Sequence, residues 1–218
     1  MLNDTKKKTI AAAVCCGLFF LLILLLKTVD VKAVGPLGSS VGFSSLNSGV
    51  FKTLGQNDLF YKLSEGIGFI ALLTAAFFAF LGLLQLVKGR SLASVDLDLY
   101  VLAAFYVVVL AFYLLFEKVI VNYRPVLEDG QLAASFPSSH TVLGITFLGA
   151  AALQFQKRLS YKKLRQIVVS VCQLLVLLIV ISRLLSGQHW LTDIIGGVLL
   201  GGALVLAYDV VSTRLSKA

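Results

Sequence analysis

Three polar residues between two apolar runs have the types and the spacing for chemistry on an anionic group. His189 and Asp193 lie four residues apart, so one helical turn would place them on the same face and within hydrogen-bonding reach. A carboxylate on one imidazole nitrogen fixes the tautomer and leaves the other nitrogen free as a base or a nucleophile. Arg183 adds a planar fork of donors that suits phosphate oxygens.

The second of the two histidines in the chain has a similar setting. His140 follows Ser138 and Ser139 at the point where a polar stretch meets an apolar run. A hydroxyl and the free N–H groups at the start of a helix suit an anion, although Ser138 could equally be a simple helix cap. A lone histidine at such a boundary is more often a packing residue, so the prediction of a site depends on both histidines acting together.

The composition indicates an integral membrane protein. Hydrophobic residues make up 58% of the 218 residues, charged residues only 14%, and the mean hydropathy is +0.93, which is unlike a soluble domain. Polar flanks can extend the shorter apolar runs toward the roughly 20 residues that a spanning helix needs. We expect a single membrane domain, residues 1–218, folded as an all-α bundle of six transmembrane helices, with spans at residues 10–26, 66–87, 99–116, 141–155, 167–181 and 194–208.

Residues 27–62 form the longest connection between the apolar runs. Glycine, proline, serine and asparagine provide turn signals along it, but its many Leu, Val and Phe residues make it too apolar for a disordered linker. We expect a small extracytoplasmic cap of short helices that lie along the bilayer surface.

The basic residues are distributed unequally between the two sides of the expected bundle. Twelve of the 19 lysines and arginines fall on the side of the termini, and dense positive charge marks the cytosolic side. Both termini should therefore be cytosolic and both histidines should face outward. This topology accounts for the net charge of +8 without nucleic-acid binding. The twelve residues are Lys6, Lys7, Lys8, Lys88, Arg90, Lys157, Arg158, Lys162, Lys163, Arg165, Arg214 and Lys217.

Several other residues favour structural roles. Trp190 is expected to be an interfacial anchor. The cysteines lie inside apolar runs, as small hydrophobes and not as a disulfide framework or a metal site; they are Cys15, Cys16 and Cys172. Four glycines in the last span are expected to let helix backbones approach closely; they are Gly196, Gly197, Gly201 and Gly202.

In its polar stretches the sequence resembles the type 2 phosphatidic acid phosphatase family of membrane lipid phosphatases. The family's third motif is Ser-Arg, five residues, His, three residues, Asp, and it is matched in full by Ser182, Arg183, His189 and Asp193. The second motif, Pro-Ser-Gly-His, is matched from Pro137 to His140 with Ser139 in place of glycine. The three motifs cover residues 118–193, and the third is the most specific of them.

The first motif departs from the family pattern, which is a lysine, six residues and Arg-Pro. Only five residues separate Lys118 from Arg124, and Glu117 stands where the lysine should be. Positions six apart on a helix are offset by about a third of a turn from positions seven apart. Pro125 also disfavours a helical Arg124, so the helix is expected to end earlier.

The resemblance implies a role for each candidate residue. His189 would attack phosphorus to form a phosphohistidine, oriented by Asp193, and His140 would protonate the leaving group and then activate water. The phosphoryl oxygens would be held by Arg124, Arg183, Lys118, Ser138 and Ser139. No cofactor and no metal is implied, because the cationic side chains can stabilise the charge that a divalent ion stabilises elsewhere.

The function implied by the resemblance is hydrolysis of a lipid phosphate or diphosphate at the outer face of the cell membrane. Undecaprenyl diphosphate, phosphatidylglycerol phosphate and phosphatidic acid are the expected substrate types, and the partners are the lipid substrate and the bilayer. A phosphotransferase of the same family is an alternative, as is a small transporter or a non-catalytic membrane scaffold. The apolar runs contain no charged residue or histidine, which disfavours transport. The sequence leaves the particular lipid and the oligomeric state open.

Overall fold

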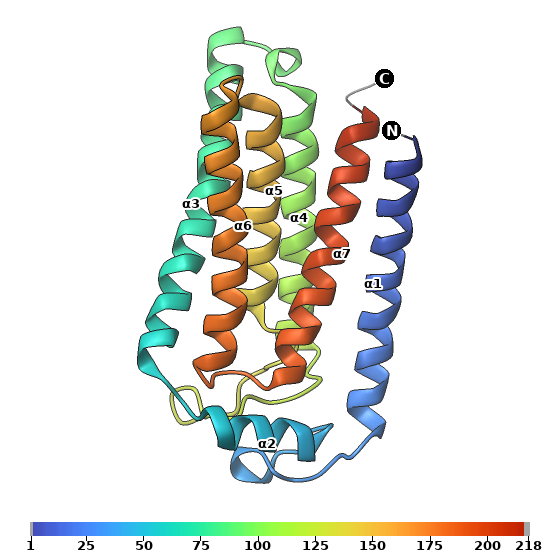
Figure 1. The fold of residues 1–218 in the computed structure, drawn as a ribbon, viewed down its shortest axis with the longest axis vertical. Coiled ribbons are helices and arrows are strands. Elements are labelled where there is room, and N and C mark those ends of the chain that lie inside the picture. The colour runs from blue at the N-terminus through green and yellow to red at the C-terminus, as the bar shows by residue number, and fades with distance from the viewer. Residues whose placement is uncertain (1, 216–218) are drawn as a thin grey trace.

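The computed structural model describes residues 2–215 and is built from helices (Figure 1). Within those residues there is no β-strand, only isolated bridges, so the all-α expectation is confirmed. Lys217 lies outside the described residues. Six long helices run side by side, with a short helix across one end; the long ones are α1 (Leu2–Thr28), α3 (Asp58–Gly89), α4 (Leu97–Lys118), α5 (Ser139–Arg158), α6 (Lys162–Leu185) and α7 (Leu191–Leu215).

Each of the six predicted apolar runs lies in a different long helix. Five of the described helices, α1, α3, α4, α6 and α7, are long and apolar enough to cross a membrane. Helix α5 does not reach that hydropathy, because it carries polar residues at its start, middle and end. It packs against α3, α6 and α7, so its polar groups are shielded from lipid. The chain is thus a multi-pass membrane protein in which α5 is an inner helix.

Glycines let α7 pack closely against α5. A Cβ atom on Gly197 would lie 2.8 Å from the side chain of Thr141, and one on Gly201 would lie 3.0 Å from Ile145. Both distances are shorter than ordinary carbon contacts, so a larger residue would push the helices apart. The expected packing role holds for these positions, whereas Gly202 has no atom within 4 Å of such a Cβ.

The cap between α1 and α3 contains the 3₁₀ turn η1 (Pro36–Gly38) and the helix α2 (Ser44–Leu54), which lies across the end of the bundle (Figure 1). Asn47 ties this cap to the start of α7: its side chain donates to Thr192 Oγ1 at 3.0 Å and accepts from the Thr192 N–H at 3.2 Å. Helix α3 begins at Asp58, so the last residues of the predicted 27–62 segment belong to a long helix.

The two ends of the bundle differ in what they carry. The ends of α4 and α6, the starts of α5 and α7 and the cap lie at one end, and the start of α1 and the end of α7 lie at the other (Figure 1). The second 3₁₀ turn, η2 (Leu92–Ser94), joins α3 to α4 at the end where α1 starts and α7 ends. All three sequence motifs therefore meet at a single end of the molecule.

Candidate active site

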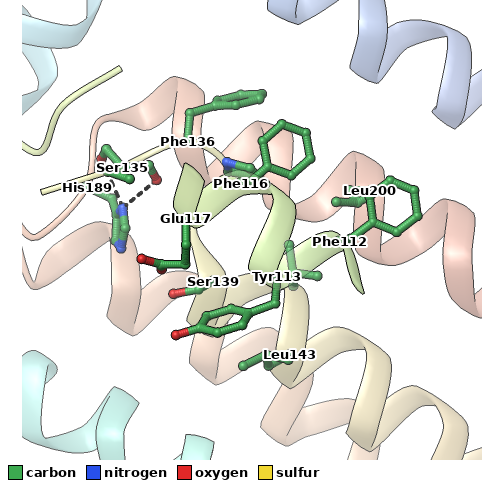
Figure 2. Close-up of a pocket in the computed structure, with 13 residues that line it drawn as sticks. Phe112, Tyr113, Phe116, Glu117, Ser135, Phe136, Ser139, Leu143, His189 and Leu200 are labelled. Atoms are coloured by element: carbon green, nitrogen blue, oxygen red, sulfur yellow. Dashed lines mark hydrogen bonds between the residues drawn. The ribbon is translucent and has the colours of Figure 1, made fainter. Parts of the chain in front are cut away.

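His189 lies in the short loop between α6 and α7 and is 3% exposed. Its Nδ1 is 3.1 Å from the backbone carbonyl oxygen of Ser135 and 3.1 Å from the Ser135 hydroxyl (Figure 2). A carbonyl oxygen can only accept, so Nδ1 carries the proton and Nε2 carries the lone pair. Burial lowers the pKa of His189 well below its ordinary range, and the positive charges of Arg183 and Arg124 lower it further. The ring is therefore neutral and nucleophilic at Nε2.

Asp193 is linked to the imidazole ring of His189 through the hydroxyl of Ser135. Its Oδ2 is 3.8 Å from His189 Nδ1, which is too long for a hydrogen bond. The Ser135 hydroxyl lies between them and donates to that oxygen. Asp193 also accepts the Trp190 N–H at 2.9 Å, as the third residue of a capped helix does. The carboxylate thus fixes the start of α7 and the serine that supports the imidazole.

Arg183 occupies the centre of the site. Its guanidinium is 1% exposed, with Nη1 3.0 Å from Glu65 Oε1 and Nη2 3.4 Å from His189 Nε2. Ser64 Oγ lies 3.2 Å from Nη1, and Nε has no hydrogen-bond partner among the described residues. An unpaired buried donor beside a nucleophilic nitrogen is suited to an anionic ligand.

His140 is linked to the same guanidinium through Glu65. Its Nε2 lies 3.0 Å from Glu65 Oε1, the same oxygen that pairs with Arg183. Its Nδ1 is buried and has no partner within residues 2–215. A Cβ on Gly68 would come within 3.3 Å of this ring, so the glycine lets the imidazole lie against α3. The Nε2 atoms of both histidines therefore lie near Arg183, one in contact with its guanidinium and the other through the shared Glu65 oxygen.

Arg124 is held at the edge of the site by the loop that precedes α5. Its N–H donates to the Ala133 carbonyl at 3.1 Å, and its Nε donates to the Ala134 carbonyl at 3.2 Å. One terminal nitrogen lies 3.4 Å from Glu128. The side chain is 12% exposed, and its charge contributes to the lowered pKa of His189. The second terminal nitrogen of Arg124 has no partner among residues 2–215, so it can bind an anion.

The two serines of the second motif have different surroundings. Ser138 is fully buried; its N–H donates to the Asp193 carbonyl at 3.0 Å, and its hydroxyl accepts from Thr141. This geometry joins the start of α5 to α7. Ser139, at the first position of α5, lines an open cavity together with His189 (Figure 2). Of the two, Ser139 is the one placed to contact a ligand.

The cavity beside His189 has a volume of about 410 Å³ and lies between α4, α5 and α7. Its walls are largely aromatic and aliphatic, from Phe112, Phe116, Val142 and Leu200. Glu117 also lines it (Figure 2), whereas Lys118 does not. Lys118 is exposed, and its side chain makes no hydrogen bond or ion pair with any residue from 2 to 215.

A second cavity, of about 640 Å³, opens between α3 and α5. Glu65 and His140 are its polar lining residues. The rest of its wall is apolar and includes Phe69, Leu72 and Phe147, of which Phe69 and Leu72 are more than half exposed at the bundle surface. The polar site therefore continues into a groove that faces the surroundings of the bundle.

Two residues of the site were not predicted from the sequence, Ser135 and Glu65. Ser135 lies two residues before the second motif, and its only signal was that proximity. Glu65 lies more than 50 residues before the first motif, just before an apolar run, and gave no signal. Among residues 2–215 no group of three or more His, Cys, Asp or Glu side chains could hold a metal ion.

Comparison with known proteins finds a family model that matches the C-terminal part of the chain. Residues 118–216 match the model of the PAP2 superfamily. The structure is similar to the crystal structure of a transmembrane PAP2-type phosphatidylglycerolphosphate phosphatase from Bacillus subtilis, with a TM-score of 0.64 and 19% sequence identity over 94% of this chain and 96% of that chain. At this identity the likeness shows a shared fold. No curated protein matches the sequence.

Proposed function

We infer that the chain, of which residues 118–216 match the model of the PAP2 superfamily, is a membrane phosphatase that hydrolyses a lipid phosphate or diphosphate through a phosphohistidine. The observation that carries this proposal is the convergence of two imidazole nitrogens on one guanidinium. His189 Nε2 lies 3.4 Å from Arg183 Nη2, and His140 Nε2 shares the Glu65 oxygen that is 3.0 Å from Arg183 Nη1.

His189 is the nucleophile in this proposal. Its Nδ1–H is held by the Ser135 carbonyl, so the lone pair is on Nε2, which attacks phosphorus as the lipid oxygen leaves. The ring gains a positive charge when the N–P bond forms, and the Ser135 hydroxyl and Asp193 support it from the Nδ1 side. Arg183 and Arg124 bind the phosphoryl oxygens and stabilise the charge of the transition state.

His140 is the general acid and base. Its Nε2 donates a proton to the departing lipid oxygen and then removes one from the water that hydrolyses the phosphohistidine. It faces the cavity between α3 and α5, so the leaving lipid would lie along the apolar groove of Phe69 and Leu72. The substrate would place its apolar chain against that wall and its phosphate at Arg183, so it is expected to be amphipathic.

The family's expected lipids fit this arrangement. The similar Bacillus subtilis protein is named as a phosphatidylglycerolphosphate phosphatase, and we propose the same class of substrate here: a lipid phosphate or diphosphate with one or more long chains. The proposed mechanism uses cationic side chains in place of a metal. The excess of lysine and arginine at the end of the termini supports a site on the outer face of the membrane.

The proposal is tested by phosphate release from purified protein in detergent, against phosphatidylglycerol phosphate, phosphatidic acid, an isoprenoid diphosphate and water-soluble glycerol phosphate. We expect a long-chain substrate to be hydrolysed, glycerol phosphate to be poor, and excess EDTA to leave the rate unchanged. Appearance of the phosphoryl group on an added lipid alcohol, without free phosphate, would instead indicate a transferase. No turnover of any lipid phosphate would overturn the proposal.

A further inference from the structure

We propose that the Glu65 carboxylate occupies, in the resting protein, the place that a phosphoryl oxygen must take, and that a bound phosphate displaces it. This inference rests on the proposed function, because it concerns the same site. It assigns a role to a residue of α3 that lies outside all three sequence motifs.

The geometry is that of an anion held by two N–H donors of the site, one from Arg183 and one from His140. One oxygen of Glu65 lies 3.0 Å from Arg183 Nη1 and 3.0 Å from His140 Nε2. Carboxylate and phosphate oxygens compete for the same N–H donors, since both are anionic acceptors. A phosphate bound between the two histidines would therefore require the donors that Glu65 now uses.

The present arrangement leaves donors and acceptors unsatisfied. Arg183 Nε and His140 Nδ1 are both buried without a partner in the described part of the chain, and buried unpaired polar atoms carry a free-energy cost. A phosphate offers more acceptor oxygens than the single carboxylate oxygen at this point, so it can engage Arg183 Nε as well. The exchange of Glu65 for phosphate thus improves the hydrogen bonding of the arginine.

Glu65 is the partner that can move. Its side chain is 42% exposed, whereas that of Arg183 is 1% exposed. Rotation of the carboxylate toward solvent costs little desolvation, but movement of the buried guanidinium would break its contacts with Ser64 and His189. The expected change on ligand binding is therefore a side-chain rotation at the start of α3.

Glu65 would then weaken the binding of inorganic phosphate, the product that leaves the same donors at the end of each turnover. A carboxylate that returns to Arg183 and His140 competes with this phosphate and repels it. The residue would favour product release, and its removal would trap phosphate in the site.

The test is the affinity of the purified protein for inorganic phosphate, measured by titration calorimetry in detergent for the wild type, Glu65→Gln and Glu65→Asp. We expect Glu65→Gln to bind phosphate about tenfold more tightly, because the competing charged hydrogen bonds are lost. Glu65→Asp keeps the charge but is one methylene too short to reach both donors, so it should also bind more tightly, though less so. If Glu65 weakened phosphate binding only through long-range repulsion by its negative charge, Glu65→Asp would bind phosphate with the wild-type affinity.

Asp58→Asn is the matched control, because it removes one negative charge from the exposed start of the same helix. It should leave phosphate affinity unchanged. An unchanged or weaker affinity in a folded Glu65→Gln, with kcat lowered, would overturn the inference and make Glu65 a support for His140. Calorimetry does not require turnover, so a wild type that hydrolyses no lipid phosphate would contradict the proposed function separately.

Discussion

His189 and Asp193 are connected through Ser135 and not directly to each other. The imidazole Nδ1 and the carboxylate Oδ2 are 3.8 Å apart, whereas the serine hydroxyl is 3.1 Å from the imidazole and donates to the carboxylate. The four-residue spacing brings the two side chains close together, but the direct hydrogen bond expected from the sequence is not formed. The helix starts between them, at Leu191, so the spacing of a regular helix does not apply.

Replacement of Ser135 by alanine should lower the rate of phosphate release. The hydroxyl link to Asp193 is lost, but the Ser135 carbonyl still accepts the Nδ1 proton, so we expect kcat to fall about tenfold with little change in KM. The control is Thr146→Ala, a buried hydroxyl on α5 that donates only to backbone carbonyls. An equal fall in both variants would indicate loss of packing and not loss of the link.

The tautomer and charge of His189 can be measured directly, because the chain has only two histidines. In ¹⁵N-histidine spectra His189 should show a protonated Nδ1 and an unprotonated Nε2, assigned by comparison with His140→Asn. An ordinary imidazole gains a proton as the pH falls through about 6.5. The lowered pKa of His189 means that it should remain neutral there.

The same shift makes the stability of the protein depend on pH. Below a pH of about 6.5 the unfolded chain binds a proton at this histidine and the folded chain does not, so the free energy of unfolding should fall as the pH is lowered from there toward the folded-state pKa. Thermal unfolding of the wild type and of His189→Gln checks this, since the variant lacks the titrating group. A His189 signal that titrates near its ordinary pKa would contradict the burial argument.

Gly197 and Gly202 provide a matched pair for the packing of α7. Alanine at Gly197 would place Cβ 2.8 Å from Thr141 and 3.2 Å from the Ser138 carbonyl oxygen, so we expect a lower unfolding temperature and a loss of activity. Alanine at Gly202 meets no atom within 4 Å and removes a helical glycine, which should stabilise the helix by about 0.5–1 kcal/mol. Equal effects of the two substitutions would refute the close contact.

Asn47 should stabilise the site from the cap. Its side chain makes two hydrogen bonds to Thr192 and one to the Gly42 carbonyl, and it is fully buried. Asn47→Ala would leave these groups unpaired, with an expected cost of about 1–3 kcal/mol. Thermal unfolding in detergent measures this, with the exposed Thr53→Ala as the control. No difference between the two variants would show that the cap does not hold α7.

The third motif could be predicted because its chemistry is carried by a short segment. Arg183, His189 and Asp193 fall within eleven residues, so one turn and one helix start determine their positions. His140 was predicted for a related reason, since its motif marks the start of a helix. The glycines of α7 were predicted as packing residues, because small side chains at helical spacing are typical of close contacts between membrane helices.

Contacts between distant segments could not be predicted in the same way. Glu65 reaches the site only because α3 packs against α5 and α6, and no local pattern encodes that neighbour. Trp190, expected at the membrane interface, is instead 3% exposed, and its indole N–H donates to the Tyr123 carbonyl at 2.7 Å. In the first motif the helix continues through Lys118, which directs Glu117 to the cavity.

The central claim is covalent catalysis by His189, and it is tested most directly by locating the phosphoryl group. Wild type and His140→Ala would be incubated with an aryl phosphate, whose leaving group needs no general acid, then quenched in alkali and mapped by peptide mass spectrometry. We expect phosphate on His189, more of it in His140→Ala because hydrolysis is slowed, and none in His189→Ala, which should also release no phosphate. Phosphate release by His189→Ala, or a phosphoryl group on any other residue, would contradict the account.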